Sequence, residues 1–267
     1  MSRADVRLHI SLMDWWKEKE PQGALSISVG VTTDTGHVRD ENEDAYGTFG
    51  PQGDTDQLVI VADGMGGHEH GREASTTAVR VVEETYFSDR SRSVPDRLRF
   101  AFQWANEQVH AKAEPQDGRA SMGTTATALS LVAGRAYLAH VGDSRAYRFR
   151  PEESQQLTHD HTVPQKMQRD GVLTPEEART HPRRGTLTRA IGTEPAVEVD
   201  LIEAGTLQSG DCFLLCTDGL ENLPREVLRD VVLGNEPQPA CEQLVERANE
   251  RGGRDNSTAL VVCIEPS

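Results

Sequence analysis

Four aspartates, far apart along the chain, each lie in a short corner marked by glycine or asparagine: Asp44, Asp63, Asp218 and Asp255. Three of these corners adjoin apolar runs typical of buried strands, so their carboxylates are expected to meet at one edge of a sheet. Several unpaired carboxylates in one place repel one another, and burying them costs several kcal/mol unless cations lie between them. The pattern therefore predicts a site for hard divalent metal ions.

Such a site has a defined chemistry. Mg²⁺ and Mn²⁺ prefer oxygen ligands in near-octahedral geometry and keep several waters. Gly64 follows Asp63 and lets the backbone come close, so its carbonyl is a further candidate ligand. Two such ions about 3.5–4 Å apart lower the pKa of a bridging water, and the resulting hydroxide can attack a phosphorus atom in line with the leaving oxygen. Arg39, five residues before Asp44, is the candidate to hold the phosphoryl group bidentately.

Composition and charge exclude several kinds of protein. The 267 residues show no compositional shift, which favours one large domain, and the net charge of −15 argues against a nucleic-acid-binding surface. No apolar run approaches the roughly 18 residues of a membrane span, and the first 20 residues lack the apolar core of a signal peptide. Cys212, Cys216 and Cys263 lie in apolar runs, where free thiols act as small hydrophobic side chains in a reducing compartment. These features predict a cytoplasmic protein.

The periodicity of apolar residues predicts strands, then two helices, more strands, two more helices and a last strand. The predicted strands are 25–33, 45–49, 57–62, 124–132, 135–141, 145–149, 197–202, 212–216 and 257–264, and the predicted helices are 73–87, 94–113, 225–233 and 239–251. This order indicates a mostly antiparallel α+β layered fold and not an alternating doubly wound sheet. Residues 150–195 are polar and rich in proline, with short helical pieces at 163–170 and 175–180, and are typical of a functional lid or insertion.

Short motifs along the chain, taken together, resemble those of a known family. They are GHVRDENED at 36–44, VADGMGG at 61–67, SMGTT at 121–125, VGDSR at 141–145, LTRAIG at 187–192, TDGL at 217–220 and RDNST at 254–258. In this order they resemble bacterial members of the metal-dependent protein phosphatase (PPM) family, the type 2C serine/threonine phosphatases. The resemblance covers residues 25 to 265, nearly the whole chain.

The resemblance implies an α+β fold, a four-layer αββα sandwich of two mostly antiparallel sheets flanked by helix pairs. It implies a single phosphatase domain at residues 24–265, preceded by an N-terminal extension at residues 1–23. Residues 150–195 match the flap of the family, an insertion that influences substrate choice.

The resemblance further implies two Mn²⁺ or Mg²⁺ ions in a channel at the edge of the sandwich. Asp63 would bridge both ions, and the Gly64 carbonyl would bind one of them. Asp218 and Asp255 would bind the other ion. The sequence does not choose between manganese and magnesium.

Other residues are implied to act around the two ions. Asp44 and Glu43 would belong to the metal site through metal-bound waters. Arg39 would hold the substrate phosphate, which makes Arg39 and Asp63 the catalytic candidates. Bacterial relatives often bind a third ion through an acid shortly before the Met-Gly-Thr-Thr motif, and Asp117 falls near that place.

Three residues depart from the catalytic pattern or stand outside it. Met65 occupies the place where many animal members have a histidine proposed as the general acid. A thioether cannot donate a proton, so protonation of the leaving group would fall to a metal-bound water or another group. Asp143 is expected to shape the Gly-Asp-Ser-Arg turn, and His140 to face solvent from its strand.

The function that the resemblance implies is hydrolysis of phosphoserine and phosphothreonine on proteins. The partners would be phosphorylated protein substrates and a cognate serine/threonine kinase whose action the enzyme reverses. The expected protein is a cytoplasmic monomer that binds neither nucleic acid nor membrane.

Two alternatives stay open. The histidine pairs in His68-Glu69-His70 and His159-Asp160-His161 are candidates for a zinc site of a histidine-metal phosphohydrolase, although catalytic zinc needs three protein ligands and no third ligand is evident. Otherwise these histidines are expected to be solvated loop residues. The second alternative is a catalytically inactive phosphatase-fold scaffold, against which the presence of every expected acid and of Arg39 argues.

Overall fold

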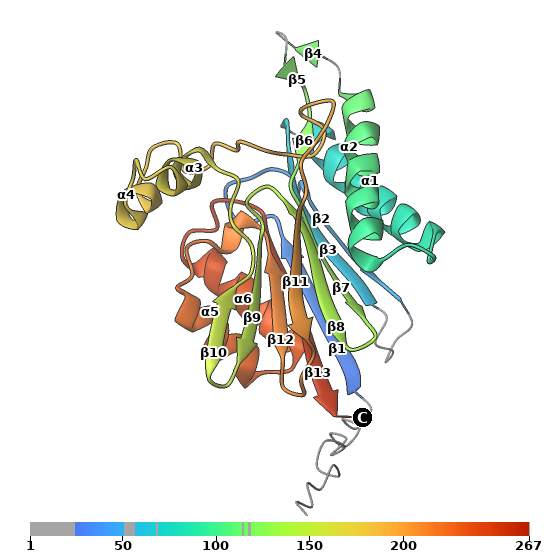
Figure 1. The fold of residues 1–267 in the computed structure, drawn as a ribbon. Helices are drawn as coiled ribbons and strands as arrows, with labels where there is room; N and C mark the ends of the chain where they lie inside the picture. Colours follow the sequence, from blue (N-terminus) through green and yellow to red (C-terminus); the bar gives the residue numbers. More distant parts are fainter. Residues whose placement is uncertain (1–24, 51–56, 68, 114, 117–118, 267) are drawn as a thin grey trace, which may run out of the picture.

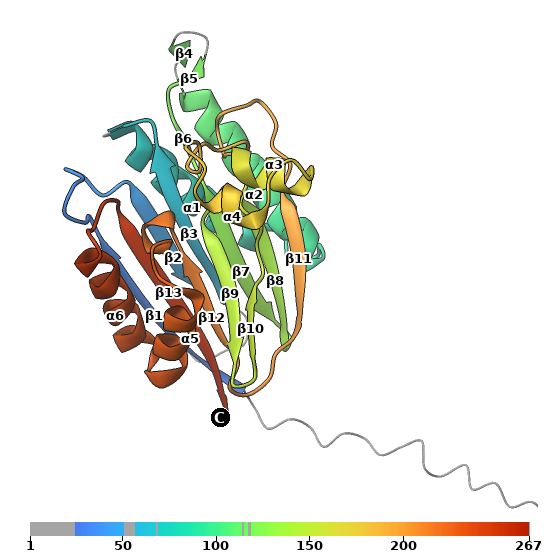
Figure 2. The ribbon, with the colours of Figure 1, turned by 90° about the vertical axis from the view of Figure 1, so that its left-hand side faces the viewer.

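The computed structural model describes residues 25–50, 57–67, 69–113, 115–116 and 119–266. Two antiparallel sheets lie face to face, and a pair of helices covers the outer face of each (Figures 1 and 2). The four-layer α+β sandwich that the family resemblance implied is therefore confirmed. The predicted N-terminal extension and the third-ion candidate Asp117 lie outside the described residues.

The first sheet has the strand order β1-β13-β12-β9-β10. Its strands are β1 (Leu25–Asp34), β9 (Arg145–Arg150), β10 (Glu153–Gln156), β12 (Cys212–Cys216) and β13 (Ser257–Pro266). Helices α5 (Arg225–Gly234) and α6 (Pro237–Glu250) cover its outer face and share an apolar cluster with β9, β12 and β13. The short 3₁₀ helix η1 (Asp218–Leu220) follows β12 directly.

The second sheet has the order β11-β8-β7-β3-β2, and β6 pairs with the end of β3. Its strands are β2 (Asp44–Phe49), β3 (Gln57–Met65), β6 (Gly123–Thr124), β7 (Ala126–Val132), β8 (Arg135–Val141) and β11 (Asp200–Thr206). Helices α1 (Glu69–Ser88) and α2 (Val94–Lys112) cover this sheet. Strands β4 (Pro115–Gln116) and β5 (Arg119–Ala120) form a separate two-stranded ribbon.

The apolar side chains of β3 divide between two layers of the core. Leu58, Ile60 and Ala62 pack in the layer under α1 and α2, whereas Val59 and Val61 pack in the layer between the two sheets. Successive side chains of a strand point to opposite faces, so a continuous apolar run is the pattern required of a strand buried on both sides. The layer between the sheets fixes how their ends, which carry the aspartates, lie relative to one another.

The predicted helices and strands are observed, but the strand predicted at 124–132 is divided into β6 and β7, and the ribbon of β4 and β5 was not predicted. The strand predicted at 197–202 is observed as β11, which starts at Asp200. The segment predicted as the start of the flap contains β10, which pairs with β9 as a hairpin. Since an isolated bridge joins Thr162 to Leu187, the part that leaves the body of the molecule is the stretch between them, with α3 (Val163–Arg169) and α4 (Pro175–Arg179).

The prediction of free thiols was wrong for two cysteines. Cys212 and Cys263 face each other across neighbouring strands β12 and β13 and form a disulfide. The apolar runs gave no sign of this pairing, because which strands become neighbours is decided by the tertiary fold. Cys216 and Cys241 are free and buried, as expected of small hydrophobic side chains. In the described part of the chain no helix is both long and apolar enough to cross a membrane.

Helix α6 packs so closely on β1 that only glycine fits at one position. A Cβ atom added to Gly30 would lie 2.3 Å from the backbone of Pro237 and Gln238. We expect Gly30→Ala to lower the free energy of unfolding by about 1–3 kcal/mol, because the helix must move off the sheet. Urea unfolding measures this change. Gly234→Ala is the matched control, since its added Cβ would meet no described atom within 4 Å; equal stabilities of the two variants would contradict the prediction.

Candidate metal centre and active site

The predicted acids come together at one end of the sandwich, from both sheets. Asp44 of β2 and Asp63 of β3 are directly opposite each other in the second sheet, so their side chains leave the same face. Asp218 follows β12 and Asp255 precedes β13, two neighbouring strands of the first sheet. A cavity of about 960 Å³, here called the metal-site cavity, is lined by Asp63, Asp218 and Asp255. Arg39, Glu43, Gly64 and Met65 line it as well.

Hydroxyl groups from other motifs hold Asp63 in place. The backbone N–H of Asp63 donates to the Thr125 hydroxyl (2.9 Å), and the Asp63 carbonyl accepts from the Thr124 hydroxyl (2.8 Å) and from the Thr125 backbone N–H (2.9 Å). The Thr125 hydroxyl also bonds to that of Ser144 (2.7 Å). The Met-Gly-Thr-Thr and Gly-Asp-Ser-Arg motifs therefore act together to fix this strand end.

Asp44 connects the two sheets. Its Oδ2 accepts hydrogen bonds from the hydroxyls of Thr217 (2.8 Å) and Thr258 (2.6 Å), which belong to the first sheet's side of the site. Its Oδ1 is buried and has no hydrogen-bond partner among the described residues, and the same holds for Oδ1 of Asp218. Two buried carboxylate oxygens without a donor are the places where a cation is expected.

Gly64 and Glu43 are packed against each other near the start of α1. The Gly64 N–H donates to the Glu43 carbonyl (3.2 Å), and an added Cβ on Gly64 would lie 2.1 Å from the Gly71 carbonyl oxygen. Only glycine allows this close approach of β3 to the helix, which leaves the Gly64 backbone beside the metal-site cavity. The Glu43 side chain is buried and lies next to Gly71.

Arg39 reaches the site as predicted and is paired with one of the acids. Its Nη2 donates to Oδ2 of Asp255 at 2.7 Å, and the two side chains are 51% and 36% exposed. This pair and the nearby Glu43 and Asp63 raise the pKa of Arg39, with the hydrogen bond to Asp255 as the largest cause. A guanidinium has five N–H donors, so one bond to Asp255 leaves others for an anion in the cavity.

Asp143, expected only to shape a turn, also belongs to the acidic site. It lines the metal-site cavity, and burial followed by the charge of Asp218 raises its pKa to about 8. The signal was present in the sequence, because Gly142-Asp143 is an acid in a glycine-marked corner after an apolar strand, the pattern of the other aspartates. Asp44, Asp63, Asp143, Asp218 and Asp255 are called the carboxylate cluster below.

Burial and mutual repulsion hold the carboxylate cluster in a state that favours protons or cations. Burial is the largest cause in each case: it raises the pKa of Asp44 to about 7 and of Asp218 to about 6, and it raises that of Asp63 well above its ordinary value. The charge of Asp218 is the next cause for Asp63, and that of Asp255 for Asp218. Like charges at this spacing resist ionising together unless a cation neutralises them.

The donor set fits hard divalent ions that keep water ligands. In the part of the chain that the structure describes, no group of three or more His, Cys, Asp or Glu side chains is arranged to enclose an ion by itself. Mg²⁺ and Mn²⁺ do not require such an enclosure, since they are commonly bound through one or two carboxylates, a carbonyl and several waters. The unpartnered oxygens of Asp44 and Asp218 and the Gly64 backbone beside the metal-site cavity supply this kind of site.

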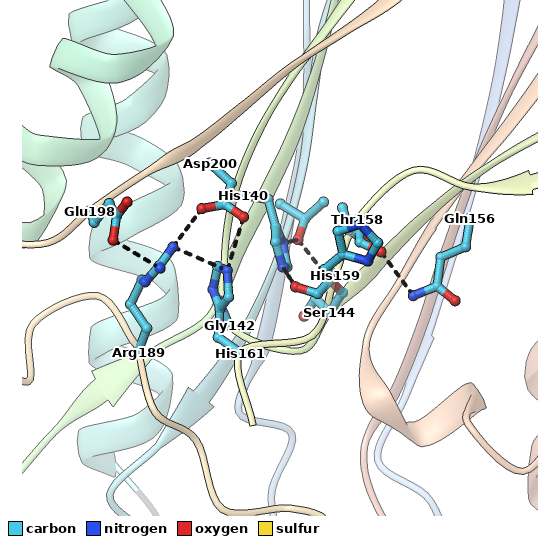
Figure 3. A network of polar contacts seen from close by, with 11 residues as sticks. His140, Gly142, Ser144, Gln156, Thr158, His159, His161, Arg189, Glu198 and Asp200 are labelled. Carbon is cyan, nitrogen blue, oxygen red and sulfur yellow. Dashed lines mark hydrogen bonds and ion pairs between the residues drawn. The ribbon is translucent and has the colours of Figure 1, made fainter. Parts of the chain in front are cut away.

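In the histidine pair at residues 159–161, the His159 side chain is exposed, as expected, whereas the His161 ring has a structural role (Figure 3). His161 is buried, contrary to the expectation of a solvated loop residue, and its Nδ1 accepts the Gly142 N–H (3.0 Å). Its Nε2 therefore carries the proton and donates to Asp200 (3.1 Å), which also binds Arg189 (2.6 Å). With both ring nitrogens engaged, His161 holds the turn before Asp143 and the end of the flap, and it is not available as a zinc ligand.

His140 was predicted to face solvent, and this prediction was wrong. Its side chain is fully buried between β7 and the Gly-Asp-Ser-Arg turn, and its Nε2 donates to the His159 carbonyl (3.1 Å) (Figure 3). Burial lowers its pKa to about 3, so the ring is neutral and Nδ1 accepts from the Thr127 hydroxyl (2.8 Å). Of the other histidine pair, His70 is exposed at the start of α1 and His68 lies outside the described residues.

Comparison with known proteins identifies the family. Residues 35–261 match the family model for protein phosphatase 2C. The chain belongs to the protein phosphatase 2C family. It is 37% identical over 236 residues to the serine/threonine phosphatase Stp of Listeria monocytogenes, a match that covers 86% of this chain and 93% of that protein. It is 35% identical over 244 residues to the protein phosphatase PhpP of Streptococcus pneumoniae, with 88% and 97% covered.

A solved structure of a phosphatase 2C relative bears on the metal centre. The catalytic domain of the serine threonine protein phosphatase PstP, crystallised in complex with two manganese ions, has a TM-score of 0.75 to this chain. The two are 31% identical, and the match covers 90% of this chain and 99% of that one. A phosphatase of the same fold therefore holds manganese, in agreement with the donor set of the carboxylate cluster.

The raised pKa values of this phosphatase site make its stability depend on pH when metal is removed. A carboxyl group whose pKa is higher in the folded than in the unfolded chain stabilises the fold below its unfolded pKa, and this contribution is lost as pH rises through the folded pKa. For Asp218, Asp44 and Asp143, with folded pKa values of about 6, 7 and 8, the loss falls between about pH 5 and pH 8. We expect the urea midpoint of chelated protein to fall over this range and Mn²⁺ to remove the slope.

The control for this prediction is Asp143→Asn, which removes one titrating group and should flatten the slope. Asp200 acts in the opposite sense, because hydrogen bonds from His161 and Arg189 lower its pKa. Its stabilisation is lost only on acidification below the range tested. A midpoint that stays constant or rises from about pH 5 to pH 8 in chelator would contradict the raised pKa values assigned to Asp44, Asp143 and Asp218 in the metal-free protein.

Proposed function

We propose that this chain hydrolyses phosphoserine and phosphothreonine esters on proteins with the help of two Mn²⁺ or Mg²⁺ ions. One observation carries the proposal: carboxylates from both sheets converge beside a half-exposed arginine on one cavity. Asp63, the Gly64 carbonyl, Asp218 and Asp255 would hold the ions, with Asp44 and Glu43 acting through bound waters. When bound, the ions supply an activated water as nucleophile and neutralise the charge that develops on the phosphoryl group.

The chain's own residues orient the substrate and keep the acids in place. Arg39 offers its remaining N–H donors to the phosphoryl oxygens, while its bond to Asp255 fixes the guanidinium direction. The hydroxyls of Thr217 and Thr258 hold Asp44, and Thr124 and Thr125 hold Asp63. Met65 lines the cavity but cannot protonate the leaving oxygen, so a water of the site is the proton donor that this arrangement supports.

We propose Asp143 as a further residue for a third ion, beside Asp117, which lies outside the described residues. Asp143 is half-buried, lines the metal-site cavity and lies within the electrostatic reach of Asp218, so its carboxylate would be available to hold another ion beside the first two. The charge of Arg145 lowers the pKa of Asp143, but Arg145 is already bound to Asp160 through three hydrogen bonds.

The biological setting follows from the reaction. Phosphoserine and phosphothreonine on proteins are formed by phosphoryl transfer from ATP, so we propose that a serine/threonine kinase of the same cell supplies the substrates and that both act in the cytoplasm. We propose a monomer as the active form, because a helix pair already covers the outer face of each sheet. The net charge of −15 is consistent with a protein substrate and not with nucleic acid.

The first experiment is metal add-back. Purified protein is stripped with chelator, and hydrolysis of a phosphothreonine peptide is then followed with Mn²⁺, Mg²⁺ or Zn²⁺. We expect activity with Mn²⁺ or Mg²⁺ and none with Zn²⁺, because the site offers hard oxygen donors. Asp218→Asn should abolish turnover yet retain the fold, since it removes one repelling charge. No activity with any metal would favour the inactive scaffold, and activity with zinc alone would revive a histidine site.

Arg39 allows a second, separate prediction. Arg39→Ala should raise KM by about ten-fold or more with a smaller change in kcat, because the guanidinium binds phosphate in the ground state and transition state alike. Arg72→Ala is the matched control: Arg72 is equally exposed and equally paired, with Glu41, but does not line the metal-site cavity. An unchanged KM in steady-state assays would move the phosphate contact to another residue.

A further inference from the structure

A second cavity lies beside the carboxylate cluster. It has a volume of about 1070 Å³ and is here called the flanking cavity. Asp143, Asp218, Asp255 and Gly185 line both this cavity and the metal-site cavity. The place where phosphate would be hydrolysed is therefore also the place where the two cavities meet.

The flanking cavity has one wall from the flap and one from the body of the molecule. On the flap side it is lined by α3 and α4, which Figure 1 shows projecting away from the sheets. On the body side it is lined by η1 and by the segment between α6 and β13, which carries Arg251 and Arg254. A segment of polypeptide that enters from the metal-site cavity would lie between these two walls.

The charge of the flanking cavity differs from that of the chain as a whole. The net charge of the protein is −15, yet outside the carboxylate cluster this cavity collects arginines: Arg179, Arg184, Arg251 and Arg254, besides the paired Arg145. Arg145 is neutralised by Asp160, and Arg184 is 3.7 Å from Glu221. Arg179 is paired with Glu176 on its own helix.

Arg251 and Arg254 are exposed and have no ion-pair partner among the residues that the structure describes. A basic residue at the carboxyl end of a helix is favourable by itself, which accounts for Arg251 at the end of α6. It does not account for Arg254, which lies beyond the helix and next to Asp255. Two unpaired guanidinium groups on one wall attract carboxylates.

The remaining lining suits an extended peptide. Gln165 and Gln168 of α3 face the flanking cavity, and their side-chain amides have no hydrogen-bond partner among the described residues. A side-chain amide both donates and accepts, as the peptide group of a bound segment requires. The flap wall can therefore form hydrogen bonds to the backbone of a bound peptide, and the body wall supplies positive charge.

We propose that the flanking cavity binds an acidic stretch of the phosphoprotein substrate adjacent to the phosphorylated residue, with its carboxylates against Arg251 and Arg254. The inference rests on the proposed phosphatase function and adds a substrate preference to it. Elsewhere the negatively charged protein repels acidic peptides. The flanking cavity therefore selects both the sequence around the phosphorylated residue and the direction in which the substrate lies.

The test compares phosphothreonine peptides with neutral flanks and with glutamates on the amino or the carboxyl side. We expect wild-type kcat/KM to favour glutamates on one side, with the preference weakening as salt rises. Arg251→Glu and Arg254→Gln should each lower kcat/KM for that peptide by about three- to ten-fold and leave the neutral peptide unchanged, as expected for exposed ion pairs. Arg247→Glu is the matched control, exposed on the same helix but outside the cavity.

Equal rates for all peptides in the wild type, or an equal loss in Arg247→Glu, would overturn the proposal. Binding of the glutamate-flanked phosphopeptide is measured separately by fluorescence anisotropy in chelator, where no turnover is needed. Weaker binding by Arg251→Glu than by Arg247→Glu supports peptide binding in the flanking cavity, even if the protein hydrolyses no peptide. A lack of hydrolysis would contradict only the proposed phosphatase function. Equal binding by the two variants in chelator would contradict peptide binding in the flanking cavity, whether or not the enzyme is active.

Discussion

Mutual repulsion among buried carboxylates is the constraint on which the rest of this structure depends. Asp44, Asp63 and Asp218 are half-buried at the edge of the sandwich, and burial raises the pKa of each. A fold can hold such a cluster only if other groups fix the acids and if protons or cations offset their charge. The hydroxyls of Thr124, Thr125, Thr217 and Thr258 do the first, and the unpartnered oxygens of Asp44 and Asp218 indicate where a cation does the second.

The cluster also explains why two sheets are needed. Asp44 and Asp63 come from the second sheet and Asp218 and Asp255 from ends of strands in the first, so their spacing is set by the apolar layer between the sheets. The hydrogen bonds from Thr217 and Thr258 to Asp44 cross from one sheet to the other at the site itself. Packing in the interior and chemistry at the edge are therefore parts of one arrangement.

The flap is tied to the same site at its base. His161 bonds to Gly142 through both its ring and its backbone N–H, and its ring also bonds to Asp200 (Figure 3). The return of the flap is fixed by the bond from the Thr188 N–H to the His161 carbonyl (2.7 Å) and by Arg189 on Asp200. The outer helices α3 and α4 thus extend from a fixed base, which lets them form a wall of the flanking cavity without disturbing the acids.

The sequence by itself determined the layered fold and most of the site, because both depend on local pattern. Alternating and continuous apolar runs defined the strands, glycine corners marked the aspartates, and the family resemblance of the motifs implied that Asp63, Asp218 and Arg39 act together. These features need only the period of a strand and the few residues of a turn. Strand β10 was not predicted, because Glu153–Gln156 is polar and becomes a strand only by pairing with β9.

Tertiary structure alone decided which distant groups meet. The partners of a strand, and hence the Cys212–Cys263 disulfide, depend on register between segments far apart in sequence. His140 is buried because β7 and the base of the flap cover it. The residue pattern of its own strand does not show this, since a strand at an exposed edge would have the same pattern. The glycine-marked corner of Asp143 was visible in the sequence, but its place beside Asp218 was decided by the tertiary fold. The local sequence pattern determines the period of each helix or strand. Long-range packing determines which side chains become neighbours, and the charge state and burial of a side chain follow from those neighbours.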